Sequence, residues 1–170
     1  MKTKLNTFAW PGHVIRRLQQ IAVLVYHRET AGHDLTPTQF VTLLAVEDQP
    51  GVDQVRLSLV TMIDRSMTAR VVETLAQRGL LRKQSGKTDK RANSLFLTPK
   101  GAQLLKKVVP CVKKSQAEIL RPLKTADRPE FMRMVRTILA AHEKPADDEL
   151  AEDGAEPRKR KSSRRKVRKS

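Results

Sequence analysis

Two short strand-like runs, each bounded by turn or helix signals, constrain the fold of this chain more than any other feature. Residues 80–85 (LLRKQS) and 94–98 (SLFLT) are typical of strands and are separated by a polar loop, which predicts a β-hairpin. The segments on both sides carry helical patterns instead. The predicted fold class is therefore mainly α with one small β-hairpin.

Helix start and stop signals surround this hairpin. Residues 36–39 (TPTQ) combine a capping threonine, a proline in the first turn and a glutamine three residues after the cap, which predicts a strong helix start. A short helix from about 53 to 60 is followed by one that Asp64 can cap and Gly79 can end. These two helices form a helix-turn-helix candidate, and a hairpin directly after such a pair is a wing. Thr98 then caps the next helix.

The first and last helices are more apolar than one small domain needs. Residues 13–28 carry apolar side chains around much of the helix, and the helix that starts at Pro99 keeps an apolar stripe in phase over about 25 residues. We expect Pro110 to bend this long helix. A final helix is predicted from about 129 to 142. Helices of this kind predict packing against a second copy of the chain.

The charge of the chain indicates an anionic partner. The net charge is +16 and the isoelectric point is near 10.6, a surplus that concentrates polyanions around a small protein. Nucleic acid and an anionic membrane are the first candidates. The longest uncharged runs, such as 35–46, are shorter than the roughly 20 residues that span a bilayer. The first residues do not resemble a secretion signal, so we expect a cytoplasmic protein without a membrane partner.

The helix predicted after Asp64 has one face suited to reading DNA. Thr68, Val72 and Leu75 line one side, and short polar groups and an arginine lie nearly opposite. Arginine can bind guanine, serine can bind phosphate or base, and small apolar groups can touch a thymine methyl. The predicted DNA contacts on this helix are Arg65, Ser66, Met67, Ala69 and Arg70. An ordinary solvated helix face remains the alternative.

The loop between the two predicted strands concentrates positive charge. Lys87 and Lys90 are predicted to neutralise phosphates, and Arg91 to enter the minor groove, where the negative potential is strongest. Asp89 is predicted to orient the guanidinium of Arg91 through a charge-assisted pair. The alternative for Asp89 is an ordinary turn-forming aspartate.

These residues, taken in order, resemble the MarR family of bacterial transcriptional regulators. The sequence DKR at 89–91 followed by LTPKG at 97–101 matches that family's wing pattern, and the resemblance extends over about residues 12–143. It implies a homodimer with two winged helix-turn-helix lobes that reads a pseudo-palindromic operator, and a cleft that binds small aromatic or phenolic acids as effectors. Relatives commonly place Ser or Thr at the positions of Met67 and Ala69, so direct base hydrogen bonds are expected to be fewer here.

The resemblance divides the chain into four parts. Residues 1–34 would form an N-terminal dimerisation helix, 35–100 the winged helix-turn-helix lobe, 101–143 the C-terminal dimerisation helices and 144–170 a disordered tail. The tail is acidic first and basic afterwards, and it is expected to hold DNA nonspecifically or only to increase solubility.

The start of the first helix carries the candidate effector contacts. The family analogy places one wall of the cleft there, and an indole, an imidazole and two guanidinium groups would suit an anionic aromatic ring. The predicted ligand contacts are Trp10, His13, Arg16 and Arg17. Tyr26 and His27 have a similar claim. Packing at the dimer interface is the alternative for both sets.

Other chemistry has little support in the sequence. The single cysteine, Cys111, is expected to be buried and structural, because peroxide-sensing relatives carry theirs near the first helices. The four histidines lack metal-site spacing, and no catalytic constellation stands out, so no metal, no cofactor and no enzyme are expected. The predicted function is a repressor released by an aromatic or phenolic acid. The alternatives are an architectural DNA-compacting protein and, with least support, a DNA-modifying enzyme.

Overall fold

The computed structural model describes residues 9–85 and 93–142 of the chain. Within these ranges the elements are α-helices, one 3-10 turn (η2) and a two-stranded antiparallel sheet, which confirms the predicted fold class. In chain order they are α1 (Pro11–Glu29), α2 (Pro37–Asp48), α3 (Gln54–Thr61), α4 (Arg65–Gln77), β1 (Leu81–Ser85), β2 (Asn93–Leu97), α5 (Pro99–Ile119), η2 (Thr125–Asp127) and α6 (Arg128–Ala140).

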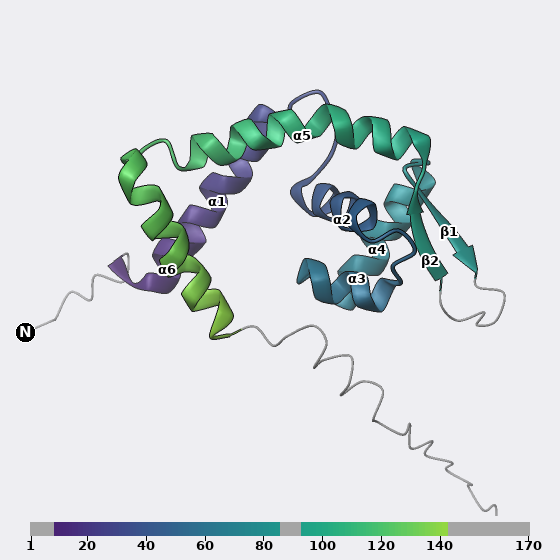
Figure 1. The fold of residues 1–170 in the computed structure, drawn as a ribbon, viewed down its shortest axis with the longest axis horizontal. Helices are drawn as coiled ribbons and strands as arrows, with labels where there is room; N and C mark the ends of the chain where they lie inside the picture. The colour runs from purple at the N-terminus through teal and green to yellow at the C-terminus, as the bar shows by residue number, and fades with distance from the viewer. Residues whose placement is uncertain (1–8, 86–92, 143–170) are drawn as a thin grey trace, which may run out of the picture.

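The elements form a lobe and an extended arm (Figure 1). Helices α2, α3 and α4 pack together with the hairpin, and α5 passes along one side of this lobe. Beyond the lobe α5 lies against α1, and α6 follows the end of α5 through η2. The predicted division of the chain into 1–34, 35–100, 101–143 and 144–170 stays a prediction, and residues 1–8 and 143–170 lie outside the described residues.

The helix starts follow the local signals in the sequence. The Thr36 hydroxyl accepts a hydrogen bond from the Gln39 amide at 3.2 Å, and the Gln39 side chain accepts one from the Thr36 amide at 3.1 Å. Such a reciprocal capping box satisfies two amides that the helix itself cannot pair. Asp53 caps α3 and Asp64 caps α4, and each of these carboxylates accepts a hydrogen bond from one backbone amide of its helix. Both the predicted capping box and the predicted Asp64 cap are confirmed.

The turn between α3 and α4 brings the two helices into the predicted helix-turn-helix. Met62 adopts a left-handed conformation (φ 55°), which is uncommon for a residue with a side chain. The Ile63 amide donates to the Ser58 carbonyl at 3.1 Å, and the Thr68 hydroxyl donates to the Ile63 carbonyl at 3.2 Å. These bonds fix the angle at which α4 leaves the turn.

The junction of α4, the hairpin and α5 is made by backbone atoms. Gly79 ends α4 with φ 68°, as predicted, and the strands pair from Leu81 opposite Leu97 onward. The Thr98 hydroxyl, which also caps α5, donates to the Gly79 carbonyl at 2.7 Å. A Cβ on Gly101 would overlap the carbonyl oxygen of Leu80. Glycine is therefore required where α5 rests on the chain that leaves α4.

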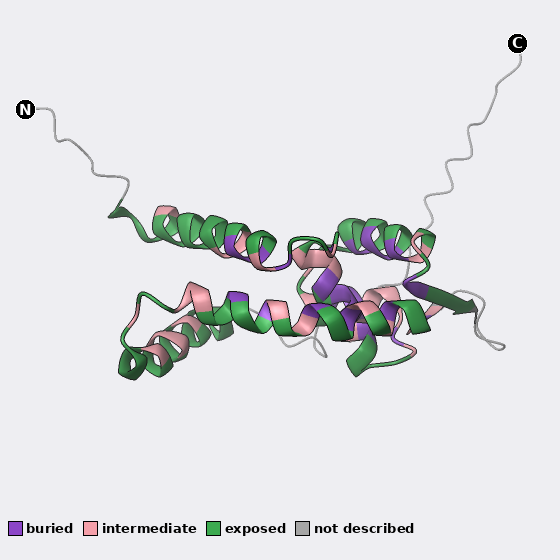
Figure 2. Cartoon of the chain, turned by 90° about the horizontal axis from the view of Figure 1, so that it is seen from above, coloured by how far each residue is buried: buried purple, intermediate pink, exposed green. Residues whose placement is uncertain are grey.

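The hydrophobic core lies under this junction (Figure 2). Its most buried side chains come from every element of the lobe and from α5: Leu43, Leu57, Val72, Leu75, Leu80, Leu95, Leu105 and Val108. By contrast, α6 has no buried residue, and the first half of α1 is mostly exposed. One chain by itself leaves the apolar stripes of these two helices uncovered.

The long helix is shorter than its apolar pattern indicated. Helix α5 has 21 residues rather than about 25, because the chain turns after Ile119 and Leu123 lies beyond the helix. Pro110 lies inside α5, and the bend expected at this residue stays a prediction.

An ion-pair cluster joins α1 to the last turns of α5. The Glu29 carboxylate of α1 accepts from Arg28 at 2.9 Å and pairs with Lys114 at 2.8 Å. The Lys114 hydrogen bond first, and then the Arg28 one, lower the pKa of Glu29, so this α1–α5 contact weakens as the pH falls through that lowered pKa.

Replacing Gly101 by alanine should destabilise the fold, although the change adds only one methyl group. The new Cβ would push α5 away from Leu80, and overpacking of this kind lowers the free energy of unfolding by about 1–3 kcal/mol. Urea denaturation at a fixed protein concentration measures the change. Gly12→Ala is the matched control, because a Cβ on Gly12 meets no atom within 4 Å and should be neutral or slightly stabilising. Equal stability of G101A and the wild type would contradict the requirement for glycine.

Candidate nucleic-acid interface

The first two turns of α4 present the predicted DNA contacts on one exposed surface. Thr68, Val71, Val72 and Leu75 are buried and fix the orientation of the helix. The residues on the opposite side of these turns are all exposed: Arg65, Ser66, Met67, Ala69 and Arg70. The structure thus brings the five together, and their contacts with DNA stay a prediction.

The Asp64 cap organises this surface. Its carboxylate accepts from the Met67 amide at 2.9 Å and from the Ser66 hydroxyl at 2.7 Å. The Ser66 hydrogen bond and then the Met67 one lower the pKa of Asp64, and Arg70 adds a smaller electrostatic contribution. The carboxylate therefore remains ionised at the helix N-terminus, where negative charge is favoured. Because the Ser66 proton is directed to Asp64, the Ser66 oxygen offers lone pairs rather than a donor.

The second half of the exposed α4 face contacts the hairpin instead. The Lys83 ammonium on β1 lies 2.6 Å from the Glu73 carboxylate on α4. The Lys83 hydrogen bond is the largest cause of the lowered pKa of Glu73. This pair was not predicted from the sequence. The pair could have been suggested only by the unlike charges of two residues near the helix–strand junction.

The hairpin leads from the lobe toward the predicted wing tip. Its register pairs Arg82 with Phe96, and the Arg82 guanidinium lies over the Phe96 ring at 4.5 Å from the centroid. This stacking covers the aromatic face while the cation stays exposed. The predicted tip contacts lie outside the described residues: Lys87, Asp89, Lys90 and Arg91. Their roles stay predictions.

A separate apolar hollow lies beside α5. Its volume is about 420 Å³, and its lining comes from α5 and the end of α2: Glu47, Ala102, Gln103, Leu105, Lys106, Val109 and Pro110. Volumes of this order suit a small aromatic molecule. The lining is mainly aliphatic, with one acid and one base that could orient a polar substituent.

The predicted ligand contacts lie elsewhere in a single chain. Trp10, His13, Arg16 and Arg17 occupy the residue before α1 and its first two turns, at the end of α1 that points away from the lobe (Figure 1). Trp10 is 54% exposed, and both arginines are exposed. The structure brings these four together but does not place them at the hollow beside α5.

Tyr26 belongs to the core rather than to an open cleft. Its side chain is buried, packs against Phe40 and donates to the Thr36 carbonyl at 3.3 Å. Burial raises the pKa of Tyr26 to about 12. His27 is exposed and meets the Tyr26 ring edge-on. Packing is thus the better interpretation of Tyr26.

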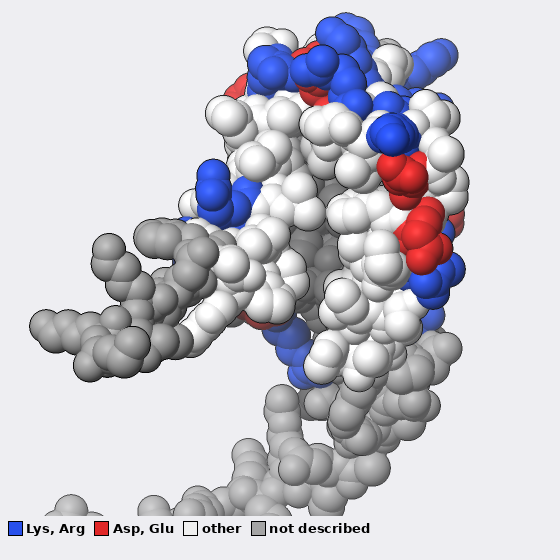
Figure 3. All heavy atoms as spheres, turned by 90° about the vertical axis from the view of Figure 1, so that its left-hand side faces the viewer, with Lys and Arg blue, Asp and Glu red and all other residues white. Residues whose placement is uncertain are grey.

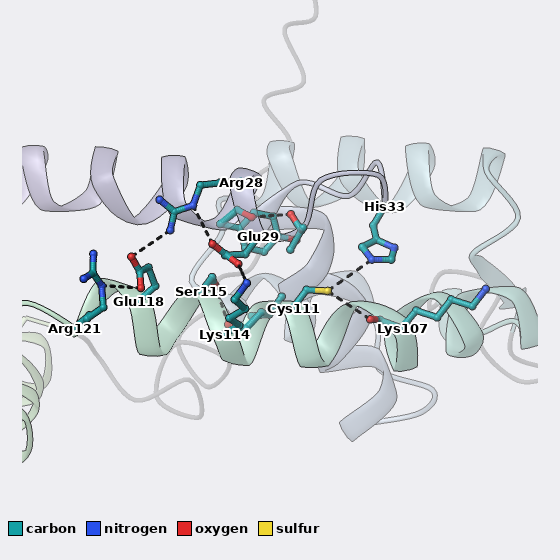
Figure 4. A network of polar contacts seen from close by, with 12 residues as sticks. Arg28, Glu29, His33, Lys107, Cys111, Lys114, Ser115, Glu118 and Arg121 are labelled. Atoms are coloured by element: carbon teal, nitrogen blue, oxygen red, sulfur yellow. Dashed lines mark hydrogen bonds and ion pairs between the residues drawn. The ribbon is translucent and has the colours of Figure 1, made fainter. Parts of the chain in front are cut away.

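Cys111 is only half-buried, so the expectation of a buried cysteine is wrong. Its sulfur lies 3.7 Å from Nε2 of His33 and 3.9 Å from the Lys107 carbonyl oxygen (Figure 4). The cysteine faces the connection between α1 and α2, which covers it less completely than the core of the lobe covers its own side chains.

The described residues contain neither a metal-binding cluster nor a membrane-spanning helix. In residues 9–85 and 93–142, no three or more His, Cys, Asp or Glu side chains gather so that they could hold a metal ion. Of the helices in this same part of the chain, none combines the length and apolar character that crossing a bilayer requires.

Comparison with known proteins assigns a family to this architecture. A sequence profile described as the MarR family matches residues 33–92. The HTH-type transcriptional repressor NicR of Pseudomonas putida is 27% identical over 132 residues, which cover 78% of this chain and 84% of NicR.

Solved structures agree in fold over most of the described residues. The transcriptional regulator PcaV of Streptomyces coelicolor is 31% identical with a TM-score of 0.70, over 78% of this chain and 97% of PcaV. BpsR of Bordetella bronchiseptica, whose DNA binding is regulated by 6-hydroxynicotinic acid, is 28% identical with a TM-score of 0.75, over 80% of this chain and 97% of BpsR. Family profile, sequence relatives and fold lead to one conclusion: this chain belongs to the MarR family of transcriptional regulators.

Proposed function

We propose that this protein is a cytoplasmic, homodimeric repressor that binds a pseudo-palindromic operator and is released by a small aromatic or phenolic acid. The observation that carries the proposal is the exposed start of α4, where Arg70 and its neighbours stand beside a hairpin that a Glu73–Lys83 pair attaches to the same helix. A capped helix N-terminus with short side chains fits the major groove, and an attached hairpin fits the adjoining backbone.

The proposed DNA contacts divide into two kinds. On α4, Arg70 reads a guanine edge, and Met67 and Ala69 touch apolar groups of bases. On the wing, Lys87 and Lys90 neutralise phosphates, and Arg91, oriented by Asp89, enters the minor groove. The base contacts give sequence preference, and the phosphate contacts give affinity and position.

The second copy is proposed to cover the apolar sides of α1 and α6. Their exposed large apolar residues are Trp10, Val14, Ile15, Leu18, Ile21, Leu24, Met134, Ile138 and Leu139. Figure 3 shows uncharged side chains in the middle of this face, with Lys and Arg gathered along its upper edge. Apolar surface of this kind is unusual on a monomer. A two-fold axis through it would give two α4 helices for two operator half-sites.

Release by an effector is proposed from the ligands that are named for two relatives and from the side chains of this chain that could bind such a ligand. PcaV has a structure in complex with its natural ligand, and 6-hydroxynicotinic acid regulates BpsR. In this chain the hollow beside α5 supplies apolar surface. Trp10, His13, Arg16 and Arg17, which lie away from this hollow in a single chain, carry groups that suit an aromatic acid. Such a ligand would favour a spacing of the two DNA-binding lobes that does not fit the operator. The factor by which the ligand weakens DNA binding then equals the factor by which DNA weakens ligand binding. The repressor role is supported by the name of NicR.

Replacing Arg70 by alanine should lower operator affinity and relax the preference for one base in each half-site. A lost bidentate contact to guanine weakens discrimination by about 1–3 kcal/mol. Competition binding with a genomic operator fragment and its single-base variants measures this effect. Lys113→Ala on α5 removes the same unit of charge from an exposed site outside the proposed interface and should leave the base preference intact. Equal affinity of the wild type for operator and random duplex would indicate an architectural protein instead.

Replacing Ile15 and Ile138 together by glutamate should separate the proposed dimer. The two side chains are 55% and 54% exposed in a single chain, and charges there would oppose burial in an apolar interface. Sedimentation equilibrium should give twice the 19.3 kDa chain mass for the wild type and the single mass for the double variant. Met62→Glu, at an equally exposed site in the α3–α4 turn, should remain dimeric. A monomeric wild type would contradict the proposal.

A further inference from the structure

A second cavity lies on a different side of α5 from the apolar hollow. Its volume is about 290 Å³, and three elements line it: the α1–α2 connection with His33, the end of α4 with Arg78, and α5 with Lys100, Gln103 and Lys107. Residues 100, 103 and 107 follow one side of the helix, at three- and four-residue spacing. Only Gln103 is shared with the hollow that Glu47 lines.

The charge of this cavity is one-sided. Arg78, Lys100 and Lys107 are cationic, and no acidic residue belongs to the lining. Arg78 pairs with Asp34, whose carboxylate lies 3.2 Å from the guanidinium, but this acidic side chain is 97% exposed and so is strongly screened by water. An anion in the cavity would therefore meet a positive potential that the protein itself leaves largely uncompensated.

Hydrogen bonds hold two of the basic groups in place. The Arg78 guanidinium is 28% exposed and donates to the Asp34 carbonyl at 2.6 Å and to the Gln39 side chain at 3.2 Å. The Lys100 ammonium donates to the Arg78 carbonyl at 2.8 Å. These bonds use only part of the donor capacity of each cation.

His33 reaches the cavity from the connection between α1 and α2. Figure 4 shows its ring reaching from the α1–α2 connection toward Cys111 on α5, with Nε2 3.7 Å from the sulfur and Lys107 one turn away on the same helix. Donors from three elements thus surround the cavity before any ligand arrives, which lowers the entropic cost of binding.

We propose that this cavity is a binding site for a small phosphate monoester. A phosphate group carries about 1.5–2 negative charges at neutral pH and three strong acceptor oxygens, which suit donors that converge from three elements. The cavity is at the small end of ligand sites, where pockets measure roughly 300 Å³ or more, so a ligand the size of glycerol 3-phosphate fits and a nucleotide does not.

The phosphate is not one of the DNA phosphates next to the recognition surface. Arg78 follows the last residue of α4, whereas Arg65 and Ser66 begin it, and 13 helical residues at 1.5 Å each separate the two ends by about 20 Å. The proposal does not rest on the proposed DNA-binding function, because the site is built from groups outside that interface.

Isothermal titration of the full chain with glycerol 3-phosphate, without DNA and at constant ionic strength, tests the site. We expect saturable binding with a dissociation constant below about 1 mM. Lys107→Gln should weaken it about two- to fivefold, as expected for one partly screened charge, and His33→Gln with Lys107→Gln should weaken it further. Lys113→Gln is the matched control, because this exposed lysine of α5 lines neither cavity and its loss should leave binding unchanged.

The remaining probes decide the ligand class. Glycerol should not bind, and succinate should bind more weakly than glycerol 3-phosphate, because its two planar carboxylates offer a different acceptor geometry. Binding of succinate as tight as that of glycerol 3-phosphate would overturn the phosphate class. Absence of saturable binding, or an equal loss in the Lys113 and Lys107 variants, would overturn the site. DNA binding is measured separately, so its failure would leave this result unaffected.

Discussion

The contact between the backbone of Leu80 and the start of α5 is the constraint on which the rest of the structure depends. Gly101 allows α5 to rest directly on the Leu80 carbonyl, and Thr98 joins the same point through its bond to the Gly79 carbonyl and through its α5 cap. The end of α4, both ends of the hairpin and the start of α5 therefore meet within a few residues. Because these are backbone contacts, α4 and the hairpin cannot shift far relative to α5 without breaking hydrogen bonds.

This junction relates the proposed sites to one another. Helix α4 carries the exposed Arg70 at its start and Arg78 just after its end, and Arg78 binds both Asp34 and the α2 capping box through Gln39. Helix α5 borders both cavities and continues to the α1 contact, where Glu29 lies between Arg28 and Lys114. A ligand beside α5 thus acts on an element that contacts the end of the recognition helix and the proposed dimerisation helix alike.

The two halves of the proposed interface differ in how well the sequence predicts them. The capped start of α4 and its exposed residues follow from local signals, since Asp64, the buried Thr68 stripe and Gly79 define both the helix and its orientation. The Glu73–Lys83 pair and the bond from Ser66 to Asp64 depend on rotamers and on how strand β1 leaves the helix. The half-buried state of Cys111 was missed for a similar reason, because it depends on how the α1–α2 connection covers α5.

The sequence by itself determined the elements, their caps and their order, because hydrogen bonds within a few residues of each other decide where a helix starts and a hairpin forms. It also determined the basic character that indicates an anionic partner. Only the tertiary structure decided that Arg78, His33 and Lys107 line one cavity, and that Gly101 must lack a side chain. Those groups come from segments up to 74 residues apart in the chain, and their meeting depends on the packing of α4 and α5, which no local pattern encodes.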